Sequence, residues 1–132
     1  TNKEQWGWEM SKDVLKSVGE TLVAANNDGS YKDLIDTIYA PDCVSVEAAA
    51  PPGGSAEAHG IEAIKGKWAW WEDNHDVHDT EATGPYLHGE DRFGVVFNID
   101  VTNKASGERV KMQEIALYTV SDGKIVREEF FY

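Results

Sequence analysis

Two glutamates, Glu114 and Glu128, stand among apolar residues near the end of the chain and are the side chains best suited to chemistry. They lie in two alternating segments, Val110 to Val120 and Lys124 to Tyr132, joined by the turn residues 121–123. Side chains two apart in a strand share a face. One face therefore collects Met112, Glu114, Ala116, Tyr118, Val126, Glu128, Phe130 and Tyr132. A buried carboxylate must be paired or neutral, so this pattern indicates a pocket that uses acid/base chemistry.

The alternative is that both glutamates lie at a solvated rim of the sheet and pair with Lys111 or Arg127. The opposite face also mixes apolar and charged residues, namely Lys111, Gln113, Ile115, Leu117, Thr119, Arg127, Glu129 and Phe131. This mixture is typical of a curved sheet that covers a pocket on one side and meets a partner on the other.

Length and charge restrict the function further. The 132 residues predict one domain, and 41% hydrophobic and 27% charged residues are ordinary for a globular protein. The formal net charge of −12 disfavours nucleic acid and polyanionic substrates. We expect a neutral or weakly anionic ligand, held by apolar and aromatic walls.

No segment has the composition of a membrane span or a signal peptide, so a cytoplasmic location without membrane association is the default expectation. Cys43 is the only cysteine and lies in an apolar strand, which predicts a buried structural role.

Helices are predicted first and strands later, which indicates an α+β fold. Residues 10–26 predict an amphipathic helix whose apolar stripe contains Met10, Val14, Val18 and Leu22, with Leu15 and Val23 beside them. Ser30 and Asp33 resemble a capping box that opens a short helix with Leu34, Ile35 and Ile38 inward. A strand over 43–47, a loop over 48–58 and a helix over 61–73 follow, the last with a stripe of Ile61, Ile64, Trp68 and Trp71. The remaining strands are predicted over 77–86, 93–101, 110–120 and 124–132.

Two segments carry a family resemblance: residues 39–47 followed by His59 to Ile64, and the ending 118–129. Together they resemble the nuclear-transport-factor-2-like superfamily, in its SnoaL-like branch, which is similar to ketosteroid isomerases. The resemblance covers about residues 10–132. It implies an NTF2-like cone, a strongly curved antiparallel or mixed sheet with three N-terminal helices on its concave face, and commonly a homodimer through the outer sheet face. The apolar Ile115, Leu117 and Phe131 are consistent with that interface.

The resemblance also implies residue roles. Glu47 falls where ketosteroid isomerases keep their proton-shuttling carboxylate. The oxyanion-side tyrosine and aspartate map near Leu22 and Ala116 and are not kept, so steroid isomerisation is not expected. Trp68, Phe130 and Tyr132 fall near pocket aromatics of those enzymes.

Other residues complete the predicted pocket. Trp71 and Phe97 would be walls, Tyr39, Tyr118, Tyr132 or a protonated Glu114 would be hydrogen-bond donors, and His75 would be a base or donor one turn beyond Trp71. Trp68 and Trp71 could instead be ordinary core. The acidic stretch 72–79 contains His75 and His78, but a solvated helix end is the favoured interpretation over a metal site.

The sequence therefore favours a cofactor-independent enzyme that moves protons on a small, largely apolar carbonyl compound: an isomerase, cyclase, dehydratase or hydrolase. Glu47 would be the base and Glu114 or Glu128 the acid. A non-catalytic domain that binds a hydrophobic ligand or a protein, and a purely structural dimerisation module, are the alternatives.

Overall fold

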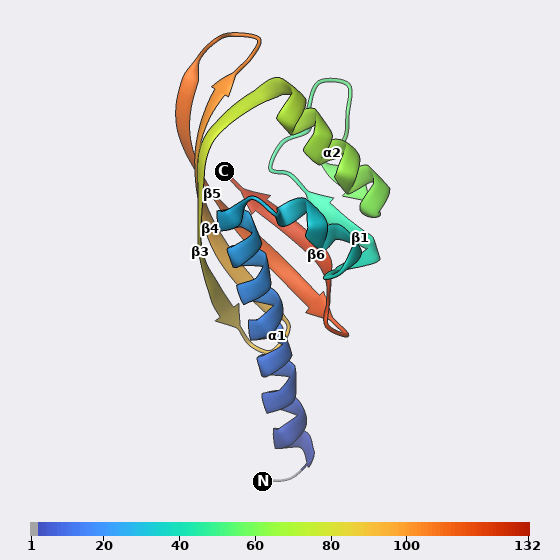
Figure 1. Ribbon diagram of the computed structural model, residues 1–132. Coiled ribbons are helices and arrows are strands. Elements are labelled where there is room, and N and C mark those ends of the chain that lie inside the picture. The colour runs from blue at the N-terminus through green and yellow to red at the C-terminus, as the bar shows by residue number, and fades with distance from the viewer. Residues whose placement is uncertain (1–2) are drawn as a thin grey trace.

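The computed structural model describes residues 3–132, with side chains from residue 11 onward (Figure 1). The elements in chain order are α1 (Lys3–Asp28), the 3-10 helix η1 (Tyr31–Asp36), β1 (Tyr39–Val46), β2 (Glu57–His59), α2 (Ile61–Asn74), β3 (His75–His88), β4 (Arg92–Asn103), β5 (Arg109–Ser121) and β6 (Lys124–Phe131). Met10, the first residue of the predicted helical stripe, lies outside the described side chains.

The six strands form one mixed sheet in the order β2-β1-β6-β5-β4-β3. Strands β1 and β6 pair in parallel, whereas the other neighbours are antiparallel. This confirms the predicted α+β fold with a mixed sheet. Figure 1 shows α1 and α2 on the same side of the curved sheet, α1 across β3 and α2 towards β1.

The helices differ in detail from the prediction of three N-terminal helices. Only α1 and α2 are long, η1 is a short 3-10 segment, and α2 follows the first two strands. Residues 57–59, predicted as loop, form the edge strand β2 because they pair with Val44 to Val46.

The buried stripe of α1 contains most of the predicted apolar residues. Leu15, Val18, Leu22 and Ala25 are buried, but Val14 is 45% exposed. The spacing of three and four residues from Leu15 to Ala25 follows the helical period, and this stripe faces the sheet. Gly19 lies in it, and a Cβ at this position would come within 2.6 Å of Pro85 in β3.

The predicted capping box at Ser30 does not form. The Ser30 side chain hydrogen-bonds to the Asp28 carboxylate, which also accepts the Ser30 backbone N–H. The two groups close a local turn, so the hydroxyl does not cap η1.

The β5–β6 hairpin places the inner-face residues as predicted along most of its length. Tyr118 is directly opposite Glu128, and Ala116 is opposite Phe130. A register shift near the turn buries Ile125 completely and leaves Val126 half-buried. On the opposite face Ile115 pairs with Phe131, and each is 50% exposed. A homodimer through this face stays a prediction.

Candidate active site

A cavity of about 1260 Å³ lies between the helices and the inner face of the sheet. Residues from α1, η1, α2 and all six strands line it, together with residues of the loop between β1 and β2. All the site residues predicted from the sequence are in this lining: Glu47, Glu114, Glu128, Tyr39, Trp68, Trp71, His75, Phe97, Tyr118, Phe130 and Tyr132. The fold therefore brings these residues to one cavity, while their roles stay predictions.

Glu128 is the most buried acid of the site, at 1% exposure. The Tyr39 hydroxyl donates a hydrogen bond of 2.8 Å to Oε2. The other oxygen, Oε1, has no hydrogen-bond partner among the described residues. Burial raises the pKa of Glu128, although the positive charge of Lys67 and the hydrogen bonds from Tyr39 and Ser45 counteract part of this rise. The alternative that Glu128 lies at a solvated rim beside Arg127 is therefore wrong.

Polar side chains engage both carboxylate oxygens of Glu47. Its Oε1 is 2.5 Å from the Lys67 ammonium, and its Oε2 accepts a hydrogen bond of 3.0 Å from the Tyr132 hydroxyl. Its side chain is 25% exposed. Glu47 comes directly after β1, opposite a lysine from α2, so it is already engaged as the partner of a cation.

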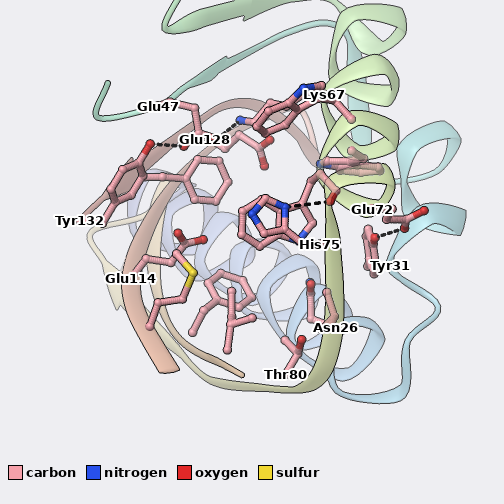
Figure 2. A pocket seen from close by; sticks show the side chains of 18 of the residues that line it. Asn26, Tyr31, Glu47, Lys67, Glu72, His75, Thr80, Glu114, Glu128 and Tyr132 are labelled. Atoms are coloured by element: carbon pink, nitrogen blue, oxygen red, sulfur yellow. Dashed lines mark hydrogen bonds and ion pairs between the residues drawn. The ribbon is translucent and has the colours of Figure 1, made fainter. Parts of the chain in front are cut away.

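Glu114 projects into the cavity from the middle of β5 (Figure 2). It is partly buried, and no described residue gives it a hydrogen bond or ion pair within bonding distance. Burial raises the pKa of Glu114 to about 7, and the negative charge of Glu47 raises it further. Lys67 lowers this pKa, by more than the charge of Glu128 raises it. A carboxyl group with this pKa both gives and takes protons near neutral pH.

Aromatic rings form much of the cavity wall beside α2. Trp68 contacts Tyr31 and Tyr39 edge-on, with ring centroids 5.4 and 5.9 Å apart. The His75 ring stacks on Trp71 at 3.8 Å, and its Nδ1 is 3.0 Å from the Trp71 carbonyl oxygen. His75 therefore lines the cavity as predicted, but a backbone contact already engages one ring nitrogen.

The outer end of this wall is fixed by a second carboxylate. Glu72 of α2 accepts a hydrogen bond from the Tyr31 hydroxyl and forms an ion pair of 3.0 Å with Lys32. The pKa of Glu72 is lowered, first by the hydrogen bond from Tyr31 and then by Lys32. These contacts tie α2 to η1 at the right of Figure 2, where Glu72 faces Tyr31.

Lys67 also lines the cavity and was not named by the sequence analysis. Its ammonium group bonds to Ser45 Oγ at 2.6 Å as well as to Glu47, and it lies 4.6 Å from the centre of the Phe130 ring. The helical period indicates that Lys67 faces the sheet, because Lys67 is three residues after Ile64 and four before Trp71 in the stripe on that face of the helix.

Cys43 is fully buried, as predicted, and burial raises the pKa of its thiol to about 12. The described residues contain no group of three or more His, Cys, Asp or Glu side chains arranged to hold a metal ion. Within the same part of the chain, no helix combines the length and the apolar character needed to cross a membrane.

Comparisons with known proteins agree with this architecture. A family model described as SnoaL-like domain matches residues 15–132. The chain belongs to the SnoaL-like domain family. A crystal structure of a Mesorhizobium loti protein is 40% identical in sequence to this chain. That protein is provisionally described as a SnoaL-like polyketide cyclase, with carbohydrate phosphatase as a second description. That match covers 94% of this chain and 97% of the other, with a TM-score of 0.77.

More distant structures share the fold alone. A Bacillus subtilis protein provisionally described as an isomerase is 18% identical over 92% of this chain and 85% of its own, with a TM-score of 0.64. An NTF2-like protein of unknown function from Burkholderia pseudomallei is 13% identical over 92% and 89%, with a TM-score of 0.68. Among curated proteins, none matches this SnoaL-like chain.

Proposed function

We propose that this SnoaL-like protein is a cofactor-independent acid/base enzyme that removes a proton next to the carbonyl group of a small, largely apolar molecule. The observation that carries the proposal is Glu114, a carboxyl group that faces a large cavity, has no hydrogen-bond or ion-pair partner among the described residues, and has a pKa of about 7. Burial of such a carboxyl group lowers the stability of the folded protein, and a role in proton transfer accounts for its presence in the cavity.

Glu114 is a better base than Glu47 on physical grounds. Both oxygens of Glu47 are already engaged, one by the Lys67 ammonium and the other by the Tyr132 hydroxyl. The ionised form of Glu114 has no such partner. We therefore assign proton transfer to Glu114, and to Glu47 the role of balancing the charge of Lys67 at the cavity wall.

The size and lining of the cavity support the substrate class. Trp68, Trp71, Phe97 and Phe130 offer aromatic surface, and the volume of about 1260 Å³ accommodates a molecule of two or more rings. Several carboxylates and only two lysines line the same cavity, so strongly anionic compounds are disfavoured.

Exchange of protons for deuterium next to a ketone tests the reaction without the natural substrate. The probe is 2-tetralone, a two-ring ketone, in D₂O, followed by proton NMR. We expect the protein to accelerate exchange, and the Glu114→Gln variant to lose about 100-fold or more of this acceleration. Because the base is active when ionised, the rate should rise with pH and level off above about 7.

The matched control is Glu108→Gln, which changes an exposed glutamate just before β5 and should leave the rate unchanged. Exchange that is as fast in Glu114→Gln as in the unchanged protein contradicts the proposal. Binding of 2-tetralone without any accelerated exchange would instead favour the non-catalytic ligand-binding domain.

A further inference from the structure

The cavity has a polar end that the proposed proton transfer by Glu114 does not use. Asn26, near the end of α1, and Thr80, in β3, are half-buried and belong to the cavity lining. Figure 2 shows both residues on the side of the cavity away from Glu47 and Lys67. The cavity therefore offers polar groups at two separate ends.

The hydrogen bond of Asn26 determines which atom of its amide group is available. Nδ2 donates to the backbone carbonyl of Leu22 at 2.9 Å, one turn earlier in α1. A carbonyl oxygen only accepts hydrogen bonds, so the amide nitrogen must be the atom that faces Leu22. Oδ1 is left on the other side of the amide group, and no described residue donates a hydrogen bond to it. Asn26 thus presents an unpaired acceptor.

Thr80 adds a hydroxyl group to this acceptor. In the described part of the chain, the Thr80 hydroxyl has no hydrogen-bond partner. A threonine hydroxyl both donates and accepts hydrogen bonds. A hydroxyl group of a ligand can therefore donate to Asn26 Oδ1 and accept from the Thr80 O–H, whereas a keto or ether oxygen can only accept from Thr80.

Two hydrogen bonds beside the pair hold it in place. Asn27, the neighbour of Asn26, donates from Nδ2 to the Ala82 carbonyl at 3.0 Å and accepts the Ala82 N–H at 2.7 Å. Ala82 is two residues after Thr80 and shares its face of β3. These bonds attach the end of α1 to β3, so both polar side chains are positioned before a ligand binds.

The register of the sheet gives the distance from this pair to the proposed base. Thr80 is paired with Ile99 of β4, and Ile99 with Met112 of β5, two residues before Glu114. Two strand spacings and one step of two residues separate the Cα atoms of Thr80 and Glu114 by about 12 Å. A two-ring molecule fits between these side chains, with one end at Glu114 and the other at Thr80.

We propose that Asn26 and Thr80 bind a hydroxyl group at the end of the ligand opposite its carbonyl group, which makes the ligand a hydroxylated ketone. This inference deepens the proposed function and rests on it for the position of the carbonyl group. The pair sets specificity, because a ketone without the hydroxyl group gains nothing from either residue.

The test compares the binding of 2-tetralone, 6-hydroxy-2-tetralone and 6-methoxy-2-tetralone by isothermal titration calorimetry. Carbon 6 is at the far end of the two-ring system from the carbonyl group. We expect the unchanged protein to bind the hydroxy compound about tenfold more tightly than 2-tetralone. The methoxy compound has no O–H to donate to Asn26 and should lose most of this preference.

Two variants remove the hydrogen-bonding groups one at a time. Asn26→Leu and Thr80→Val retain the approximate size of each side chain. Each should reduce the preference for the hydroxy compound to about threefold or less, with little change in the affinity for 2-tetralone. Thr83→Val is the matched control and should keep the full preference, because Thr83 is exposed on the opposite face of β3. If one variant does not fold, as judged by circular dichroism, the other decides the result.

Deuterium exchange on the same ketones separates this inference from the proposed function. Equal binding of the hydroxy compound and 2-tetralone, or a preference that the variants keep in full, overturns the role of Asn26 and Thr80 even when Glu114 catalyses exchange. A preference that the variants lose, without exchange in the unchanged protein, supports this role and overturns Glu114 as base. Absence of binding of all three ketones overturns the ligand class and with it both proposals.

Discussion

Glu114 should make the protein less stable at neutral pH than it would be with an uncharged residue at this position. The pKa of its carboxyl group is about 7, compared with an ordinary value of 4.5. Below pH 4.5 the group is protonated in both the folded and the unfolded chain. Between pH 4.5 and 7 the unfolded chain releases the proton while the folded chain keeps it, so the free energy of unfolding falls as pH rises.

The size of this effect follows from the difference in pKa. Each unit of difference is worth about 1.4 kcal/mol, which gives an upper limit of about 3 kcal/mol for Glu114. The side chain keeps some contact with solvent, and screening there reduces the value to about 2 kcal/mol. Replacement by glutamine removes the titration. We therefore expect the free energy of unfolding of Glu114→Gln, relative to the unchanged protein, to increase by about 2 kcal/mol between pH 4.5 and pH 8.

Urea denaturation followed by tryptophan fluorescence at pH 4.5, 6, 7 and 8 measures this difference. Glu47 and Glu128 are present in both proteins, so their own contributions largely cancel. Glu108→Gln, at an exposed site, should show no comparable trend. A stability difference for Glu114→Gln that is constant across the range would refute the reasoning, because it would show that Glu114 titrates alike in the folded and unfolded chain.

Three further predictions concern the cavity and the contacts that build it. Lys67→Met should raise the pKa of Glu114 above about 7, because Lys67 lowers it. Lys65→Met removes only exposed ion pairs with Glu62 and Asp36 and should leave the pKa of Glu114 unchanged. NMR titration of the glutamate side chains measures the pKa of Glu114 in both variants. Gly19→Ala should destabilise the protein although alanine favours helices, because the new Cβ would lie 2.6 Å from Pro85. Gly66→Ala in α2, where the new Cβ meets nothing within 4 Å, should instead gain up to about 1 kcal/mol in thermal denaturation, and a Gly19→Ala variant as stable as Gly66→Ala would show that α1 does not pack closely on β3. Phe93→Ala should cost about 3–5 kcal/mol of unfolding free energy, because Phe93 is fully buried and stacks on Tyr118, while Phe131→Ala, at a half-exposed position, should cost far less; equal losses in urea denaturation would contradict this placement of the core.

The sequence predicted more of the fold than of the chemistry of the site. Alternation along residues 110–132 assigned Glu114, Tyr118, Glu128 and Phe130 to one face, and the structure places all four in the cavity lining. The Asp122 and Gly123 turn fixed this hairpin, because both residues adopt the positive φ that a tight hairpin turn requires. Local patterns of this kind can be interpreted because they depend on neighbours in the chain.

The predictions that failed depended on contacts between distant segments. The predicted apolar stripe held both Val14 and Leu15, and packing on β3 decides that Leu15 is buried and Val14 exposed. Residues 57–59 have weak strand character, and pairing with β1 makes them a strand. The Ser30 hydroxyl could either cap η1 or bond to a neighbouring side chain, and it hydrogen-bonds to the Asp28 carboxylate.

The surroundings of the three glutamates were decided only by the tertiary structure. Their positions on the pocket face followed from a two-residue period and a family resemblance. The pKa values of Glu114 and Glu128 depend on burial and on the placement of one cation, Lys67, from a helix more than 40 residues away from Glu114 in the chain. Because that lysine pairs with Glu47, Glu128 is left as a buried acid held by Tyr39, and Glu114 as the carboxyl group whose pKa lies near neutrality.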